Sequence, residues 1–219
     1  MGRGVGVTNR FHPRDSVEFG RVLSFSDGLF AIAMTLLVVE VGVPKLVHEG
    51  DIRELARDLS DLIPNFVGFF LSFAVIGRYW IAHHQMFSLL RGVDLGMIMR
   101  NLVYLAFVAF LPFPTALLGD YFSNPLAISV YAVVAAIVSG LEVVLLRHAY
   151  RADLLRVRIR PEVLRWGTMA SLSPVVLFAL SIPVAYWNTG AAVAVWFLSI
   201  PVGIYLNRIR PPGAEILEG

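Results

Sequence analysis

Residues 21–43 read RVLSFSDGLFAIAMTLLVVEVGV, and this stretch decides the fold class. Between Asp27 and Glu40 it holds no charged residue, and a helix needs about 20 apolar residues to cross a bilayer. Similar runs recur along the 219 residues, of which 57% are hydrophobic and only 16% are charged. A soluble domain is about 45–50% apolar and about 25% charged. Because helices satisfy their own backbone hydrogen bonds in lipid, the chain is predicted to be an all-α membrane protein.

The apolar runs divide into six spans. The last uncharged run, Trp166–Asn207, is too long for one crossing, and YWNTG at residues 186–190 supplies a turn. Pro112 and Pro114 are expected to end or kink the third helix. The predicted helices cover residues 22–43, 62–88, 98–118, 126–147, 164–186 and 191–208. The domain prediction is an N-terminal tail at 1–20, one six-helix transmembrane domain at 21–209 and a C-terminal tail at 210–219.

Arginine placement predicts the orientation in the membrane. If the N-terminus lies inside, only Lys45, Arg53 and Arg57 of the 18 lysines and arginines fall outside. The positive-inside rule therefore places both termini in the cytoplasm of a multi-pass protein of the cell membrane. The arginine-rich segment 147–165 is interpreted as a topogenic loop that touches lipid headgroups, and nucleic acid is not an expected partner.

Several function classes are excluded or disfavoured by missing residues. The chain has no cysteine, so disulfides, cysteine-ligated zinc, iron–sulfur clusters and thiol nucleophiles are excluded. No HExxH, GxSxG or paired-aspartate helix motif occurs, so neither an enzyme nor a cofactor is expected. Adjacent His83 and His84 diverge by about 100° on a helix and chelate one ion poorly, so no metal site is predicted.

Ionisable side chains avoid lipid, so polar residues within a span mark interior or pore-facing positions. The first helix has the most of them: Arg21, Ser24, Ser26, Asp27, Thr35 and Glu40. The second helix follows with Ser72, Arg78, His83, His84 and Gln85. These two helices are predicted to carry the function. Inside a bundle Asp27 needs a partner, and the candidates are Arg21, Arg78, His83, His84 and Asn101.

One face of the first helix is apolar except for a single hydroxyl. At about 100° per residue, Phe25, Thr35, Leu36 and Val39 all lie within about 60° of Ile32. Asp27 lies about 140° away from Ile32 and points elsewhere. By itself this stripe is ambiguous, because an ordinary helix–helix contact and a pore lining have the same pattern.

Three motifs in order resemble the transmembrane protein 175 family. They are RVLSFSDG with FAIAMTLL in residues 21–37, HHQMF at 83–87 after Trp80, and FLPFPT at 110–115 after Asn101. That family comprises potassium channels of animal endolysosomes and shorter prokaryotic relatives, and the single six-helix repeat resembles the prokaryotic members. The resemblance covers residues 21–118, whereas the last three helices match only in hydropathy and length.

The resemblance implies an assembly and a pore. Four six-helix repeats surround an axis in this family, so a single-repeat chain is expected to be a homotetramer lined by its first helix. The hydrophobic constriction falls on Ile32, the selectivity-linked threonine falls on Thr35, and Leu36 and Val39 complete the pore lining. The family's inter-helix polar network falls on Arg21, Phe25, Ser26, Asp27, Trp80, His84 and Asn101.

The expected function is passive flux of monovalent cations with modest selectivity for potassium, the permeant ion. An apolar ring at Ile32 would block ions by excluding water, and a threonine ring offers few ligands. The alternative is a proton-permeable channel or a proton-coupled transporter that uses Asp27, His83 or His84 as relays.

Overall fold

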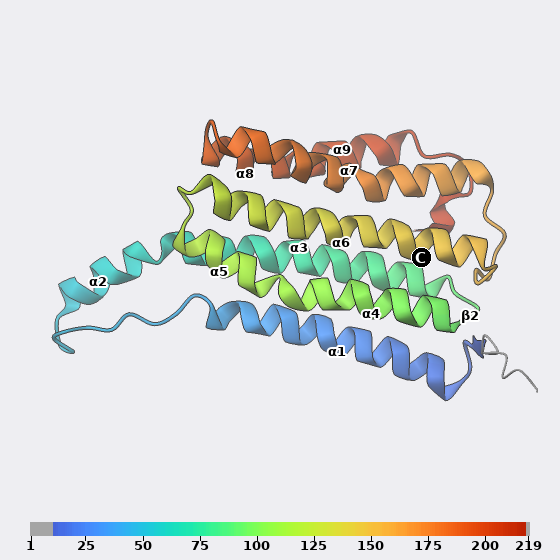
Figure 1. Cartoon of the computed structure of the whole chain (residues 1–219), viewed down its shortest axis with the longest axis horizontal. Helices are drawn as coiled ribbons and strands as arrows, with labels where there is room; N and C mark the ends of the chain where they lie inside the picture. The colour runs from blue at the N-terminus through green and yellow to red at the C-terminus, as the bar shows by residue number, and fades with distance from the viewer. Residues whose placement is uncertain (1–10, 218–219) are drawn as a thin grey trace, which may run out of the picture.

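The computed structural model describes residues 11–217. The described chain is almost entirely helical (Figure 1). Its elements are β1 (His12–Pro13), α1 (Val17–Val39), α2 (Ile52–Asp61), α3 (Ile63–Ser88), β2 (Gly92–Val93), α4 (Leu95–Phe110), α5 (Pro112–Asp120), α6 (Pro125–Arg151), α7 (Pro161–Ala185), α8 (Thr189–Phe197), α9 (Ser199–Arg208) and the short 3₁₀ helix η1 (Ala214–Leu217).

Within residues 11–217, six helical spans are long and apolar enough to cross a membrane, which confirms the predicted all-α fold with six transmembrane helices. α1, α3, α6 and α7 are single rods, while α4 with α5 and α8 with α9 make two composite spans, Leu95–Asp120 and Thr189–Arg208. In Figure 1 α1 lies on one flank of the bundle and α7 to α9 lie on the opposite flank. Between them α6 packs against α4, α5 and α7, and α3 packs against α1 and α5.

Local sequence explains where the helices begin. The Ser16 hydroxyl accepts a hydrogen bond from the Phe19 amide, so α1 starts at Val17 rather than at the predicted residue 22. Asp94 caps α4 in the same way, and Asn124 caps α6. Each cap satisfies an amide at the first turn that has no partner within the helix.

Prolines explain the breaks in the composite spans. The break expected at Pro112 is present, since α4 ends at Phe110 and α5 begins at Pro112. α8 similarly gives way to α9 just before Pro201. Proline lacks the amide that would continue the ladder and crowds the preceding turn. α7 nevertheless continues through Pro174 and Pro183 as one helix.

α2 is a helix where the sequence-based expectation has only an outer loop. It projects beyond the bundle (Figure 1), and none of its residues is buried. Asp51 caps it by accepting from the amides of Arg53 and Glu54. Ile52, Leu55 and Leu59 repeat on one face, so the signal for this helix was present in the sequence.

Residues just before α1 are fastened to the α3–α4 connection, although they fall within the predicted tail at 1–20. β1 pairs with β2, His12 opposite Val93. Arg14 donates to the carbonyls of Ser88 and Leu90. A Cβ at Gly92 would clash with the His12 carbonyl oxygen, so only glycine admits this approach. Residues 1–10 lie outside the described part of the chain.

The predicted C-terminal tail also returns to the bundle over its described residues. Ala214 is buried against Ile159 and Val163. Arg160 donates to the Pro212 carbonyl. Residues 218 and 219 lie outside the described part.

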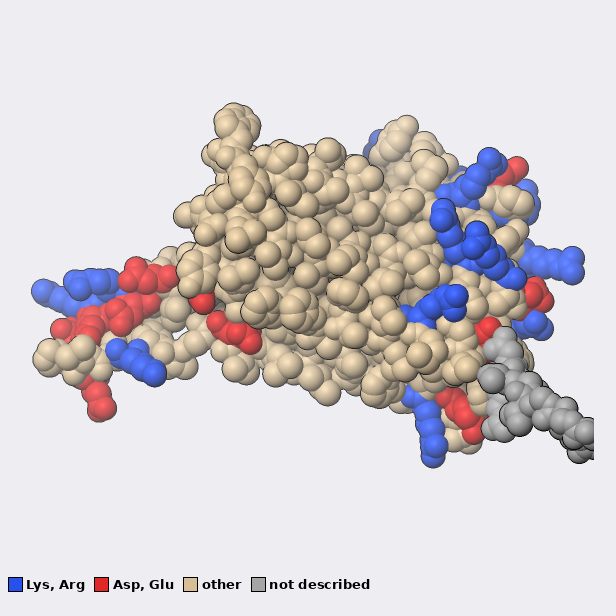
Figure 2. Space-filling view, viewed as in Figure 1, with Lys and Arg blue, Asp and Glu red and all other residues tan. Residues whose placement is uncertain are grey.

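On the face shown in Figure 2, charged side chains gather at the two ends of the bundle. Figure 2 shows an uncharged flank between an arginine-rich end and the α2 end, where both signs of charge occur. The arginine-rich end holds the start of α1 and the α3–α4 and α6–α7 connections (Figure 1). An uncharged band bounded by polar ends is what a bilayer requires.

Candidate functional site

One face of α1 is held by the bundle. Phe30 and Leu37 have no exposed surface, and Ser26 and Ala33 are buried beside them. Phe30, Ala33 and Leu37 form one core with Ile76 of α3 and other side chains of α3 and α4. This face sets the rotation of α1 about its own axis.

The opposite face of α1 is the predicted stripe, and the described chain leaves it uncovered. Phe25 is 54% exposed, Ile32 59%, Leu36 45% and Val39 68%. Thr35 is exposed among them. An uncharged surface of this length must be covered by lipid or by another protein surface, or must line a water-filled space.

Thr35 is the one hydroxyl on the stripe. Its Oγ1 donates a hydrogen bond of 2.9 Å to the Ile32 carbonyl of the same helix. The hydroxyl hydrogen is thus engaged, whereas the oxygen lone pairs remain acceptors. An oxygen with these properties suits a cation better than it suits an anion.

Behind the stripe, a hydrogen-bonded chain joins three helices. His83 Nε2 of α3 meets Asn101 Oδ1 of α4 at 2.8 Å. The Asn101 amide nitrogen donates to Ser26 Oγ of α1 at 2.9 Å. Ser26 in turn donates to the Val22 carbonyl. We call His83, Asn101 and Ser26 the three-helix chain.

Aromatic rings surround the histidine of the three-helix chain. The His83 ring stacks on Phe87 with centroids 4.2 Å apart. Phe30 and Tyr104 each lie with their ring centroids 5.5 Å from it. His83 is only 2% exposed. Asn101 Oδ1 therefore accepts a hydrogen bond from His83 Nε2 beside these aromatic rings.

Asp27 is hydrogen-bonded by Trp80, which the resemblance includes in the inter-helix network, rather than by one of the five candidate partners named from the polar residues of the spans. Trp80 Nε1 donates to Asp27 Oδ1 at 3.0 Å, which joins α3 to α1. His84 is exposed and lies beside the Trp80 ring, with centroids 5.6 Å apart. Arg21 is exposed and forms no hydrogen bond or ion pair within residues 11–217.

The resemblance implies His84 as a member of the inter-helix network. The structure places His84 beside the Trp80 ring and joins His83 to Asn101 in the three-helix chain. The buried positions of α3 include Ser72, Ile76, Tyr79, His83 and Phe87, a spacing of three and four residues. That periodicity alone puts His83 on the buried face, and His84 falls outside it.

A second buried polar cluster lies toward the α2 end, and sequence reasoning did not single it out. The Thr115 hydroxyl donates to Ser72 Oγ at 2.8 Å, and Ser72 donates to the Tyr131 hydroxyl. Tyr79 also donates to the Ala135 carbonyl. These bonds join α3 to α5 and α6. Among the described residues, no group of three or more His, Asp or Glu side chains could hold a metal ion.

Comparisons with known proteins match this architecture. The family model for the endosomal/lysosomal potassium channel TMEM175 matches residues 21–112, which include the stripe and the three-helix chain. A potassium channel of Chamaesiphon minutus is 42% identical over 141 residues, 62% of this chain and 68% of that protein. The human endosomal/lysosomal proton channel TMEM175 is 38% identical over 97 residues, 42% of this chain but only 19% of that protein.

A solved structure extends the match beyond α5. It is the crystal structure of a lysosomal potassium-selective channel TMEM175 homolog from Chamaesiphon minutus, with a TM-score of 0.72 and 31% identity. The alignment covers 88% of this chain and 98% of that one. With two thirds of a curated relative and nearly all of a solved homologue covered, the chain belongs to the TMEM175 family of ion channels as a six-helix member of the prokaryotic type.

Proposed function

We propose that this chain is the subunit of a potassium channel in which the uncovered stripe of α1 lines the pore. The observation that carries the proposal is the division of α1 into two faces. One face is fixed by the core and by the three-helix chain, while the other presents Phe25, Ile32, Thr35, Leu36 and Val39. The names of the bacterial relatives, which are called potassium channels, support this reading.

The pore requires several copies of α1 around an axis, and we propose four. The proposed homotetramer would cover the edges of the stripe and leave its centre facing an axial space. Both termini would lie in the cytoplasm of a cell-membrane protein, since the arginine-rich end is the one the positive-inside rule retains.

The proposed mechanism divides two tasks between neighbouring turns. Four Ile32 side chains converging on the axis make an apolar ring, which closes by excluding water and opens when the helices move apart. Four Thr35 oxygens, one turn further along, replace part of the hydration shell of a cation. Because each copy offers one neutral ligand, discrimination between potassium and sodium is modest. Leu36 and Val39 continue the apolar lining.

Proton permeation is the second candidate function. Relatives named proton channels support it, and the three-helix chain offers a histidine whose Nε2 proton already lies on a hydrogen bond. Asp27, held by Trp80, and His84 beside it are the other groups that could accept a proton. These groups lie behind the stripe, so a relay through them would run apart from the path of the metal ions.

Flux from proteoliposomes tests both candidates. Purified protein would be reconstituted with a potassium gradient, and potassium, sodium, caesium and proton fluxes would be compared with protein-free vesicles. Potassium flux above sodium flux is the expected result. His83→Gln separates the candidates, since a relay predicts loss of proton flux with potassium flux retained. Absence of any cation flux from correctly folded protein would contradict the channel proposal.

A further inference from the structure

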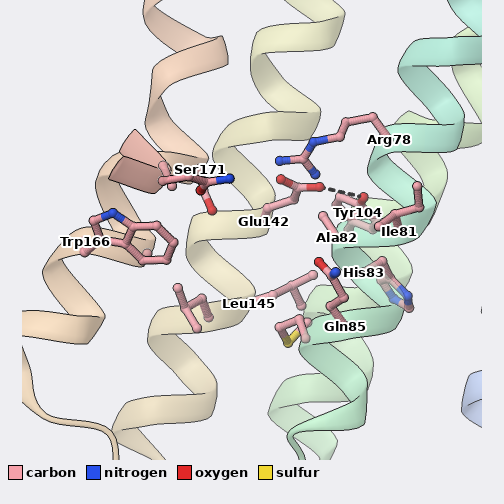
Figure 3. A pocket seen from close by; sticks show the side chains of 15 residues that line it. Arg78, Ile81, Ala82, His83, Gln85, Tyr104, Glu142, Leu145, Trp166 and Ser171 are labelled. Carbon is pink, nitrogen blue, oxygen red and sulfur yellow. Dashed lines mark hydrogen bonds between the residues drawn. The ribbon is translucent and has the colours of Figure 1, made fainter. Parts of the chain in front are cut away.

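A partly open pocket, called the polar chamber, lies between helices on the side of the subunit away from α1. It has a volume of about 460 Å³ and is walled by α3, α4, α6, α7 and α9. Figure 3 shows Arg78 of α3 and Glu142 of α6 projecting into it toward one another, with Trp166 of α7 across the space. No residue of α1 contributes to its wall.

The two charged side chains in this chamber, Arg78 and Glu142, do not form a direct ion pair with each other. The Tyr104 hydroxyl donates to Glu142 Oε1 at 3.3 Å. Within residues 11–217 the Arg78 guanidinium makes neither a hydrogen bond nor a direct ion pair. Arg78 lies well inside the α3 span, where an ionised side chain without partners is costly. The N–H donors of Arg78 and the second carboxylate oxygen of Glu142 are therefore available to a ligand bound between the two side chains.

The wall holds a further acceptor without a donor. His83 lines the chamber, and its Nδ1 is buried with no partner among the described residues. Because Nε2 donates to Asn101, Nδ1 carries the lone pair. An occupant of this chamber thus meets one fixed cation on α3 and acceptors on α3 and α6.

An apolar chamber of about 530 Å³ adjoins the polar one. The two share Arg78, Ala170 and Asn207. Beyond these residues the apolar chamber is lined by side chains such as Leu71, Phe178, Trp196 and Ile204. Together the chambers offer a charged end and a hydrocarbon end at a size typical of ligand sites, about 300–1,000 Å³.

We propose that the two chambers bind a single-chain amphiphile with a zwitterionic headgroup. Its anionic group would pair with Arg78 and its ammonium group with Glu142, while the chain lies along Leu71, Phe178 and Trp196. Charge complementarity selects the zwitterion, because an anionic head would also face Glu142 and a cationic head would also face Arg78. The Trp166 ring adds an aromatic face to the polar chamber, as ammonium sites in proteins often do.

Tryptophan fluorescence can measure binding of an amphiphile at this site directly. Purified protein in a non-ionic detergent would be titrated with lysophosphatidylcholine brominated in its acyl chain, since bromine quenches nearby indoles. The expected result is a saturable component of quenching that disappears in Trp196→Phe. Arg78→Gln and Glu142→Gln should each weaken the apparent affinity about tenfold or more, because each removes one member of a charge-assisted contact. Arg100→Gln, on α4 outside both chambers, should leave the affinity unchanged.

A second variant keeps both charges and blocks the passage. Ala170→Leu places extra volume where the chambers join, so saturable quenching should be lost while the melting temperature stays near wild type. Brominated alkyl sulfate and alkyl trimethylammonium probes of equal chain length complete the comparison. The proposal is overturned if an anionic or cationic probe binds as tightly as the zwitterion. It is equally overturned if folded Ala170→Leu and Arg78→Gln proteins bind like wild type, or if quenching is never saturable.

Discussion

Ile32 and Thr35 occupy neighbouring positions on the uncovered face of α1, yet their side chains contribute different chemistry. Ile32 offers only hydrocarbon, and more than half of its surface is exposed in the single chain. Thr35 offers an oxygen whose hydrogen is directed back to the Ile32 carbonyl. Substitution at each position therefore tests a separate step, the exclusion of water or the coordination of an ion.

Ile32→Asn should raise the basal potassium flux severalfold. An amide ring holds water where an isoleucine ring excludes it, so the closed state becomes conductive. The measurement is potassium efflux from proteoliposomes at matched protein content. Ala31→Asn is the control, because Ala31 is also exposed on α1 but lies about 100° away from the stripe. Equal flux from wild type and Ile32→Asn would show that the constriction lies elsewhere.

Thr35→Val should move the potassium-to-sodium permeability ratio toward one while current is retained. Valine has nearly the same shape and the same β-branching, so helix packing is preserved while the oxygen ligand is deleted. Reversal potentials under bi-ionic conditions measure the ratio and do not depend on channel number. Thr35→Ser keeps the hydroxyl and should keep the wild-type ratio. A wild-type reversal potential in Thr35→Val would remove the threonine ring from the mechanism.

At the scale of elements, α1 depends on α3 and α4 for its position. The three-helix chain and the Trp80–Asp27 bond both bind the arginine-rich half of α1. Toward the α2 end α1 is held by apolar contacts such as those of Ala33 and Leu37. When the stripe moves, these polar contacts must either move with α1 or break and form again. They therefore affect how the pore opens, although their side chains do not contact the ion.

Asn101→Leu should destabilise the bundle by about 2–5 kcal/mol, since His83 Nε2 loses its acceptor and Ser26 Oγ loses the donor from Asn101, both in a buried place. Thermal unfolding in detergent, followed by fluorescence-detected size exclusion, measures the shift. Ser129→Ala is the matched control, because the Ser129 hydroxyl bonds the Pro125 carbonyl of its own helix and joins no second element. A folded Asn101→Leu protein as stable as the control would show that the three-helix chain is dispensable.

At the scale of the whole molecule, the subunit has two working sides. The α1 flank is uncovered and is proposed to meet other copies, whereas helices of the opposite flank, α7 to α9 (Figure 1), help to line the two chambers. α6 separates them as the most extensively buried span. A ligand in the polar chamber would consequently influence the pore through α3 and α4, which line the chamber and also pack against α1.

The solubilised complex should contain four copies of the 24.2 kDa chain. Native mass spectrometry in detergent measures the stoichiometry directly. Ile32→Cys provides a geometric check, because cysteines on the pore axis should form disulfide-linked dimers on oxidation, whereas Ala31→Cys should do so less readily. A monomeric, flux-competent protein would contradict the assembly.

The absence of native cysteine also permits a clean topology measurement. Single cysteines at Leu55 on α2 and at Arg158 in the α6–α7 connection can be probed with a membrane-impermeant maleimide on intact cells. Leu55→Cys should be labelled and Arg158→Cys protected until the cells are permeabilised, in line with the positive-inside rule. The reverse pattern would place both termini outside.

The sequence by itself determined the properties that depend on neighbours along the chain. Hydropathy delimited six spans, and Pro112 indicated the break between α4 and α5. Helical spacing placed Ile32, Thr35 and Val39 on one face. Such features follow from local geometry and from transfer into lipid, and both can be read from the chain alone. α2 belongs to the same class, since its cap and its apolar repeat are local too.

Only the tertiary structure decided which side chains meet across helices. Within the polar network that the resemblance implies, Trp80 is the residue that donates to Asp27, and His83 is the residue that bonds Asn101. Arg78 and Glu142, 64 positions apart in the numbering, face one chamber. These contacts depend on the rotation and depth at which whole helices pack, which is set by the combined burial of many side chains. The charge and polarity of a side chain indicate that it needs a partner, but the packing of the helices determines which residue that partner is.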